Sequence, residues 1–267
     1  MDKIVAAPGC LCFFRAFRME LRRALQNVLF PAGYLASLAT MLMGVQVYAS
    51  TDRDVSAAYL LEYAVIGSMG LLYLIWGVLP HGLSYCEDWR SGFLRQAASR
   101  CPVRIYCAAK CCAAFLSSAL TMALAAASFL WILSFSRPLD GDIYLDSTGY
   151  RTWKPGQPLF GLLIIITILA LGSGLFSVAG LWISGYIRNS FAVLASPLLL
   201  YYTQDILFRS LLPDCPRQFQ FFAVYFQTPG FSTRAADFCY SCGFLLAAAA
   251  LFGTLFVIHG GKERRNG

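Results

Sequence analysis

Two acidic residues that lie within apolar segments are the first candidates for chemistry in this chain. Glu62 lies in the stretch AAYLLEYAVI, and Asp205 lies in LLLYYTQDIL. Ionisable groups are costly in hydrocarbon, so each residue is a functional hypothesis by default. Either could carry protons in a relay. We expect both near the outer ends of their segments, where they would line a pathway or an outer vestibule.

The other reactive side chains are typical of structural roles. His81 and His259 lie at the ends of apolar segments, where histidine usually caps carbonyl groups or meets the interface. Cys239-x-x-Cys242 has the spacing of a metal or redox pair, but we interpret both as small helix residues. No phosphate-binding loop of the form G-x-x-x-x-G-K-[ST] occurs. We therefore expect no catalytic residue, no cofactor and no metal in this chain, and no enzyme activity of its own.

The elements that carry these residues are predicted to span a membrane. The chain is 58% hydrophobic and only 13% charged, whereas a soluble domain has about 25% charged residues. A spanning helix needs about 20 predominantly apolar residues, and six windows qualify: 28–49, 58–82, 106–135, 158–187, 190–212 and 237–259. The predicted fold class is an all-α integral membrane protein with six transmembrane helices, forming one domain over 1–267.

Residues within two of these segments predict how the helices pack or bend. Pro197 should bend or interrupt the fifth span, because proline removes a helix hydrogen bond. Gly172, Gly174 and Gly180 should permit close packing in the fourth. The 136–157 loop is expected to form a small outer hairpin, and the aromatic segment 213–237 to form short interfacial or re-entrant helices.

The distribution of basic residues predicts the orientation in the membrane. With the N-terminus inside, fourteen of the 21 Lys and Arg residues fall on the inner side, as the positive-inside rule requires. Both termini of this multi-pass protein are therefore predicted to be cytoplasmic, at the cell membrane. The net charge of +7 is concentrated where anionic lipid lies, so no nucleic-acid partner is needed to explain it.

An amphipathic helix is predicted before the first span. Arginines recur at helical spacing along one face and aromatic residues along the other, which suits a helix in the plane of the lipid headgroups. The residues concerned are Phe13, Phe14, Arg15, Phe17, Arg18 and Arg22. The alternative is that this stretch simply begins the first span, with its arginines extended to the surface.

The most polar stretch of the chain, 84–110, is predicted to form a cytoplasmic insert between the second and third spans. From Glu87 onward one short helix is expected, with Trp89 and Phe93 on its apolar face and Arg95 away from it. Pro102 should end it, since a proline pushes the preceding residue out of the helical region. Such a helix suits docking into a groove on another protein, although it could also rest on the lipid surface.

The insert resembles the pattern E-x(4)-G-x-L … P-x-[RS]-x-[YF]-x(3)-K of type 2 ABC exporter permeases, the ABC-2 membrane proteins. The matching residues are Glu87, Gly92, Leu94, Pro102, Arg104, Tyr106 and Lys110. The six predicted spans and the amphipathic N-terminal helix are similar to the same family. The sequence departs from the pattern at Cys101, where serine is commoner, and in the second acidic residue, Asp88.

The resemblance implies a function and a set of partners. The insert would be a coupling helix that docks on a separate ABC ATPase subunit, which would bind ATP and magnesium. The N-terminal helix would be the elbow helix, and the permease would pair with a second copy or with a sister permease in membrane lipid. The residues implied to contact or orient the ATPase are Glu87, Trp89, Gly92, Phe93 and Arg95. The expected cargo is amphipathic or hydrophobic: a peptide, a drug, a lipid or a lipid-linked glycan.

Two other functions stay open at this point. The first is an ion- or proton-coupled secondary transporter that uses Glu62 or Asp205. The second is a sensor or immunity scaffold that has the same fold and moves no cargo.

Overall fold

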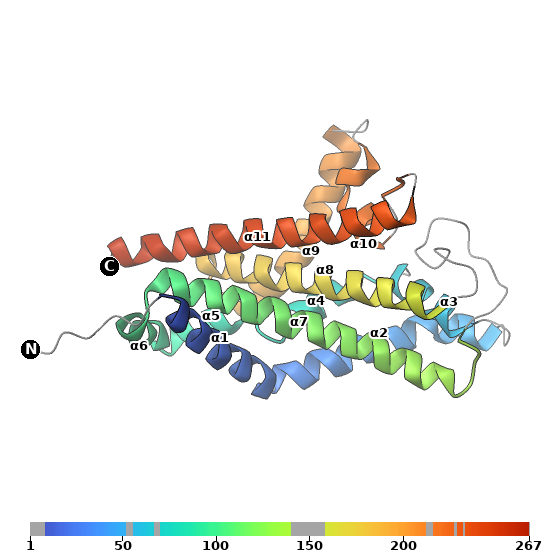
Figure 1. The fold of residues 1–267 in the computed structure, drawn as a ribbon, viewed down its shortest axis with the longest axis horizontal. Coiled ribbons are helices and arrows are strands. Elements are labelled where there is room, and N and C mark those ends of the chain that lie inside the picture. The colour runs from blue at the N-terminus through green and yellow to red at the C-terminus, as the bar shows by residue number, and fades with distance from the viewer. Residues whose placement is uncertain are drawn as a thin grey trace, which may run out of the picture.

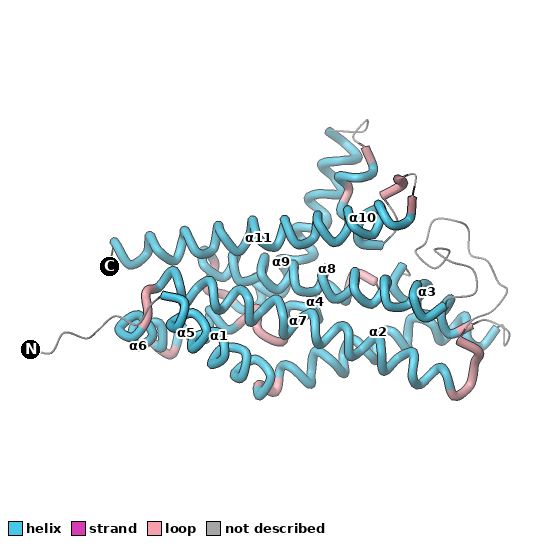
Figure 2. Tube along the Cα trace, viewed as in Figure 1, coloured by secondary structure: helices cyan, strands magenta, loops and turns pink. Residues whose placement is uncertain are grey.

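The structure is a computed structural model that describes residues 9–51, 56–66, 70–139, 158–211, 216–226, 229–231 and 233–266. Within these residues all regular elements are helical, which confirms the predicted all-helical class (Figure 2). The start of α1 (Gly9–Gln26), the two short helices α5 and α6, and the end of α11 (Arg234–Asn266) lie at the same end of the bundle (Figure 1).

Four helices of the described residues are long and apolar enough to cross a membrane. They are α2 (Leu29–Thr51), α7 (Val103–Ser134), α8 (Pro158–Tyr186) and α11. Each corresponds to a predicted span with bounds that agree within a few residues, except that α11 runs on to Asn266. The protein is therefore membrane-like by the length and composition of its helices.

The second and fifth predicted spans have a different form from the one expected. Two shorter helices, α3 (Ala57–Ile66) and α4 (Leu72–Val78), occupy the second window. In the fifth, α9 (Ser190–Ile206) contains Pro197 and passes into a π-helical turn at Leu207–Leu211. Neither window holds a single continuous helix of spanning length, so six spans stay a prediction.

The insert also differs from its prediction. In place of one helix it contains α5 (Ser84–Arg90) and α6 (Phe93–Arg100), separated by Ser91 and Gly92. Gly92 has a φ of 71°, in the left-handed region that glycine adopts at little cost. Cys101 is extended before Pro102, so the predicted end of the helix is confirmed.

The core lies around α8, which packs against α7, α11, α4 and α9. Glycines make this packing close. A Cβ atom added to Gly172 would lie 2.0 Å from the Tyr225 ring, and one added to Gly174 would lie 2.7 Å from the Phe115 ring. One added to Gly180 would lie 3.1 Å from Val78. The predicted role of the three glycines is therefore confirmed.

Short helices occupy the aromatic segment before α11, in agreement with the sequence. A 3₁₀ turn at Arg217–Phe219 precedes α10 (Phe221–Phe226). Phe221 and Tyr225 of α10 contact the ring of Phe176 in α8, with centroid distances of 5.0 and 6.5 Å. Most of the predicted outer hairpin, 140–157, lies outside the described residues.

Candidate functional site

A group of charged side chains joins the insert to the rest of the molecule. We call it the charge cluster, and it comprises Glu20 and Arg23 of α1, Asp88 of α5, Tyr106 and Lys110 of α7, and His81 from the turn between α4 and α5. Glu20, Asp88 and Lys110 are fully buried, and Tyr106 and His81 nearly so. Four separate segments therefore meet at one buried polar centre.

Lys110 lies at the middle of the charge cluster. Its ammonium donates to Glu20 Oε2 at 2.9 Å and contacts Asp88 Oδ2. The hydroxyl of Tyr106, one turn earlier on α7, donates to Asp88 Oδ2 at 2.6 Å and lies 3.2 Å from Glu20 Oε1. The two α7 side chains thus hold one carboxylate from α1 and one from α5 together.

Arg23 closes the charge cluster on its more exposed side. Its guanidinium donates to Glu20 Oε1 at 2.9 Å and to Asp88 Oδ1 at 2.8 Å. The same group lies 4.8 Å from the centroid of the Phe93 ring in α6, a cation–π arrangement. Arg23 therefore links α1 to both helices of the insert.

The charges of the cluster balance when His81 is neutral. Two carboxylates, Glu20 and Asp88, face two cations, Arg23 and Lys110. Burial alone would raise the pKa of Glu20, but hydrogen bonds from His81 and Lys110 and the charge of Lys110 outweigh burial and hold that pKa well below its usual range. Glu20 stays ionised at physiological pH, so the charge cluster suits a rigid connection better than proton transfer by Glu20.

Local sequence explains how these groups come together. Ala16, Glu20 and Ala24 recur every four residues on the buried face of α1, and the small alanines let that helix approach α7 closely. Tyr106 and Lys110 are also four residues apart, so they share one face of α7. Glu20 on one face of α1, together with Tyr106 and Lys110 on one face of α7, therefore forms the centre of the charge cluster.

His81 gives this site a predicted pH response. His81 Nε2 lies 3.1 Å from Glu20 Oε2, and a neutral imidazole protonated on Nε2 would donate there. Burial lowers the pKa of His81, and the hydrogen bond to Glu20 offsets only part of this effect. The unfolded chain therefore binds the proton more readily, so acidification below about pH 6.5 should lower the free energy of unfolding.

The measurement is the melting temperature in detergent micelles across this pH range. His81→Gln keeps a hydrogen-bond donor but cannot titrate, so the acid-side fall in melting temperature should become shallower. An equal fall in wild type and His81→Gln would contradict this role of His81.

The residues predicted to contact an ATPase have different environments. Glu87 and Gly92 are exposed, and Trp89 is 40% exposed. Phe93 is partly buried beside Arg23. Arg95 lies in α6, and its side chain falls outside the described part of the chain. The guanidinium carbon of Arg188, from the turn between α8 and α9, lies 3.4 Å from the centroid of the Trp89 ring.

The structure has a helix, α1, where the sequence predicts an amphipathic one, and it packs against α7. Its role as an elbow helix stays a prediction. Asn27 separates α1 from α2, accepting a hydrogen bond from the Leu29 amide at 3.1 Å, so α1 is not simply the start of the first span. The arginine face is exposed as predicted, while the aromatic residues divide between a partly buried row and the 61% exposed Phe14. The six residues are Phe13, Phe14, Arg15, Phe17, Arg18 and Arg22.

The two acidic candidates for a pathway lie in separate helices. Glu62 is buried within α3, with 7% of its surface exposed. Asp205 lies in the last turn of α9, and its side chain is outside the described part of the chain. Neither belongs to the charge cluster.

Sequence reasoning missed Glu20 and the role of His81, and it treated Asp88 only as a departure from the family pattern. The available signal was an acidic residue, Glu20, with an alanine four residues before it and another four residues after it, together with Lys110 near the start of a predicted spanning helix.

No protein-family model, curated protein or solved structure matches this chain. Family membership therefore stays a prediction from the motif.

Proposed function

We propose that this chain is the permease subunit of an ATP-driven exporter of the ABC-2 type, which moves an amphipathic or hydrophobic cargo across the cell membrane. The observation that supports this function best is the charge cluster, because it ties the insert to α1 and α7 through Asp88. A coupling element must be fixed to the helices that it moves. The sequence motif of the insert supports the choice of family. The attachment of the insert to α1 and α7 supports a role in transmitting movement to these helices.

The proposed complex has two permease chains, identical or sister, each with its own ATPase subunit. In this arrangement α3 and α4 together form the second of six spans, α9 forms the fifth, and both termini are cytoplasmic. ATP binding draws the two ATPase subunits together and displaces α5 and α6. Because Asp88 is held by Arg23 and Lys110, the displacement reaches α1 and α7 together.

Exposure refines which residues of the insert should contact the ATPase. Glu87 and Trp89 present accessible side chains, and Gly92 presents backbone. Phe93 is instead partly buried beneath Arg23, so its truncation would disturb the insert itself. Glu87→Ala is therefore the sharper test of docking, and Trp89→Ala truncates a side chain that is exposed but also stacks on Arg188.

The experiment is ATP turnover by this chain co-expressed with an ABC ATPase, taken from the genes that flank its own if they encode one, and reconstituted in lipid discs. We expect wild type to co-purify with the ATPase and to modify its turnover. Glu87→Ala combined with Trp89→Ala should lower co-purification or coupled turnover about fivefold or more, because tryptophan is enriched among the minority of interface residues whose truncation costs more than about 1 kcal/mol.

A matched control is Trp131→Ala, which removes an exposed tryptophan near the other end of α7. It should leave co-purification unchanged. The proposal fails if wild type binds no ATPase, or if the insert variant binds and stimulates the ATPase as wild type does.

A second candidate function is ion- or proton-coupled transport, which the burial of Glu62 in α3 favours. That function predicts transport without an ATPase and its loss in Glu62→Gln or Asp205→Asn. The exporter predicts the reverse: transport requires the ATPase subunit and persists in both carboxyl variants. A scaffold that moves no cargo would bind partners and show neither result.

A further inference from the structure

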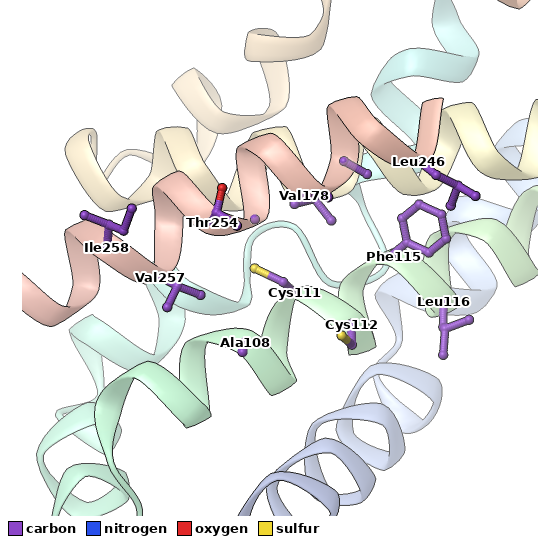
Figure 3. Close-up of a pocket in the computed structure, with 13 residues that line it drawn as sticks. Ala108, Cys111, Cys112, Phe115, Leu116, Val178, Leu246, Thr254, Val257 and Ile258 are labelled. Carbon is purple, nitrogen blue, oxygen red and sulfur yellow. The ribbon is translucent and has the colours of Figure 1, made fainter. Parts of the chain in front are cut away.

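An apolar groove on the surface of the bundle lies between α7 and α11, with α8 at its bottom (Figure 3). Its volume is about 680 Å³, within the range of sites that hold small organic ligands. Buried Val178 and Cys111 lie at its bottom, and the exposed side chains of Leu116, Leu246 and Ile258 stand along its rims. The groove therefore has a floor and raised rims, and its lining is apolar along its length.

The depth of the groove comes from small residues. A Cβ atom added to Gly253 of α11 would lie 3.7 Å from Val178 and 3.9 Å from Cys111 of α7. Nearer the ends of the helices, a Cβ atom added to Gly260 would lie 2.8 Å from the Cys107 sulfur. The two helices therefore approach each other closely and leave the groove above their line of contact.

The length of the groove matches one leaflet of a bilayer. Its lining on α11 runs from Leu246 to Ile258, which corresponds to about 18 Å at 1.5 Å per residue. Half of the hydrocarbon core of a membrane is about 15 Å thick. A single acyl chain lying along the groove would therefore reach from the surface to the middle of the membrane.

Basic residues occupy the end of both helices at the surface. Arg104 is exposed and lies one turn before Ala108, which begins the lining on α7. Lys262 lies one turn after Ile258 on α11. These positions continue the two lining rows toward the end of the bundle where α5 and α6 lie (Figure 1). The side chain of Lys262 lies outside the described part of the chain, so a negative headgroup at this end is placed against the exposed guanidinium of Arg104.

We propose that the groove binds one acyl chain of an anionic phospholipid, whose headgroup phosphate lies at Arg104. Apolar burial cannot supply the selectivity, since a lipid tail is equally apolar in the surrounding bilayer. Selectivity comes from the headgroup, because each basic residue near the surface favours an anionic lipid by about fivefold. Binding here is independent of the exporter function and needs no ATPase.

The test is native mass spectrometry of the full chain, extracted from discs that contain equal parts of phosphatidylglycerol and phosphatidylcholine. Wild type should retain one phosphatidylglycerol per chain and prefer it to phosphatidylcholine. Arg104→Gln should reduce that preference about fivefold. Ala250→Phe, which places a ring in the groove, should lower the amount of either lipid retained.

Two controls separate the groove from the general surface. Arg18→Gln removes an exposed arginine of α1, and Leu251→Phe enlarges an exposed residue of α11 outside the groove lining. Both should leave retention unchanged. Equal retention of the two lipids by wild type, or equal losses in the controls, would overturn the proposal. It would also fail if Cys112 cross-linked to Cys112 of a second copy while no lipid was retained, because the groove would then be a protein interface.

Discussion

Lys110→Met should lower the free energy of unfolding by about 3–5 kcal/mol, the usual cost of removing one partner from a buried ion pair. Lys110 is fully buried and bound to both Glu20 and Asp88. Its loss leaves two buried carboxylates facing one cation of the charge cluster, Arg23, whose side chain is 39% exposed. Part of the cost will appear as protonation of a carboxylate, because the pKa of Glu20 rises when the lysine charge is removed.

The measurement is unfolding in detergent micelles, monitored by near-ultraviolet circular dichroism. Asp88→Asn combined with Lys110→Met restores one acid and one base, so the double variant should be more stable than the two single losses added together. Arg22→Met, which removes an exposed charge from α1, should change stability by less than about 0.5 kcal/mol. Strict additivity of Asp88→Asn and Lys110→Met would show that the charge cluster does not act as a unit.

Gly172→Ala should lower the free energy of unfolding by about 1–3 kcal/mol, the typical cost of adding a group to a tightly packed core. The new Cβ atom would lie 2.0 Å from Cε2 and 2.5 Å from Cδ2 of Tyr225. That ring also packs on Phe176 and Phe221, so it cannot turn away freely. Relief of the clash requires α10 to move away from α8.

Thermal unfolding of Gly172→Ala in the same micelles tests this packing. The control is Gly243→Ala in α11, where an added Cβ atom would have no atom of the described structure within 4 Å. It should leave stability unchanged or raise it slightly, since alanine favours a helix more than glycine. Equal effects of the two alanines would mean that α10 is not held against α8.

Hydropathy predicted the four long helices well, because it reports on apolar surface along one continuous segment. The second and fifth predicted spans show where such averaging fails. The 58–82 window is apolar throughout, but hydropathy gives no information on helix continuity, and the chain forms α3 and α4 there. The break at Gly92 was not predicted for a similar reason: the apolar residues of 87–99 follow helical spacing both before and after this glycine.

The charge cluster could not be assembled from sequence for a different reason. Glu20 and Lys110 are 90 residues apart, and their contact depends on how α1 lies against α7. Spacing within one segment predicts a shared face, as it did for the arginines of α1. It does not predict which buried face meets it from another helix. The role of Asp88 in the charge cluster is evident only once α5 is placed against the contact between α1 and α7.

Arg188 stacks on the Trp89 ring, so a partner that binds this face of the insert would compete with Arg188 for it. Arg188 belongs to the turn between α8 and α9, and its carbonyl also accepts a hydrogen bond from Arg90 at 3.3 Å. A partner that covers the Trp89 ring must accommodate this guanidinium or displace it. In the second case, by thermodynamic reciprocity, whatever loosens the turn strengthens partner binding by the same factor. The occupancy of one aromatic face would then report on the position of the turn that joins α8 and α9.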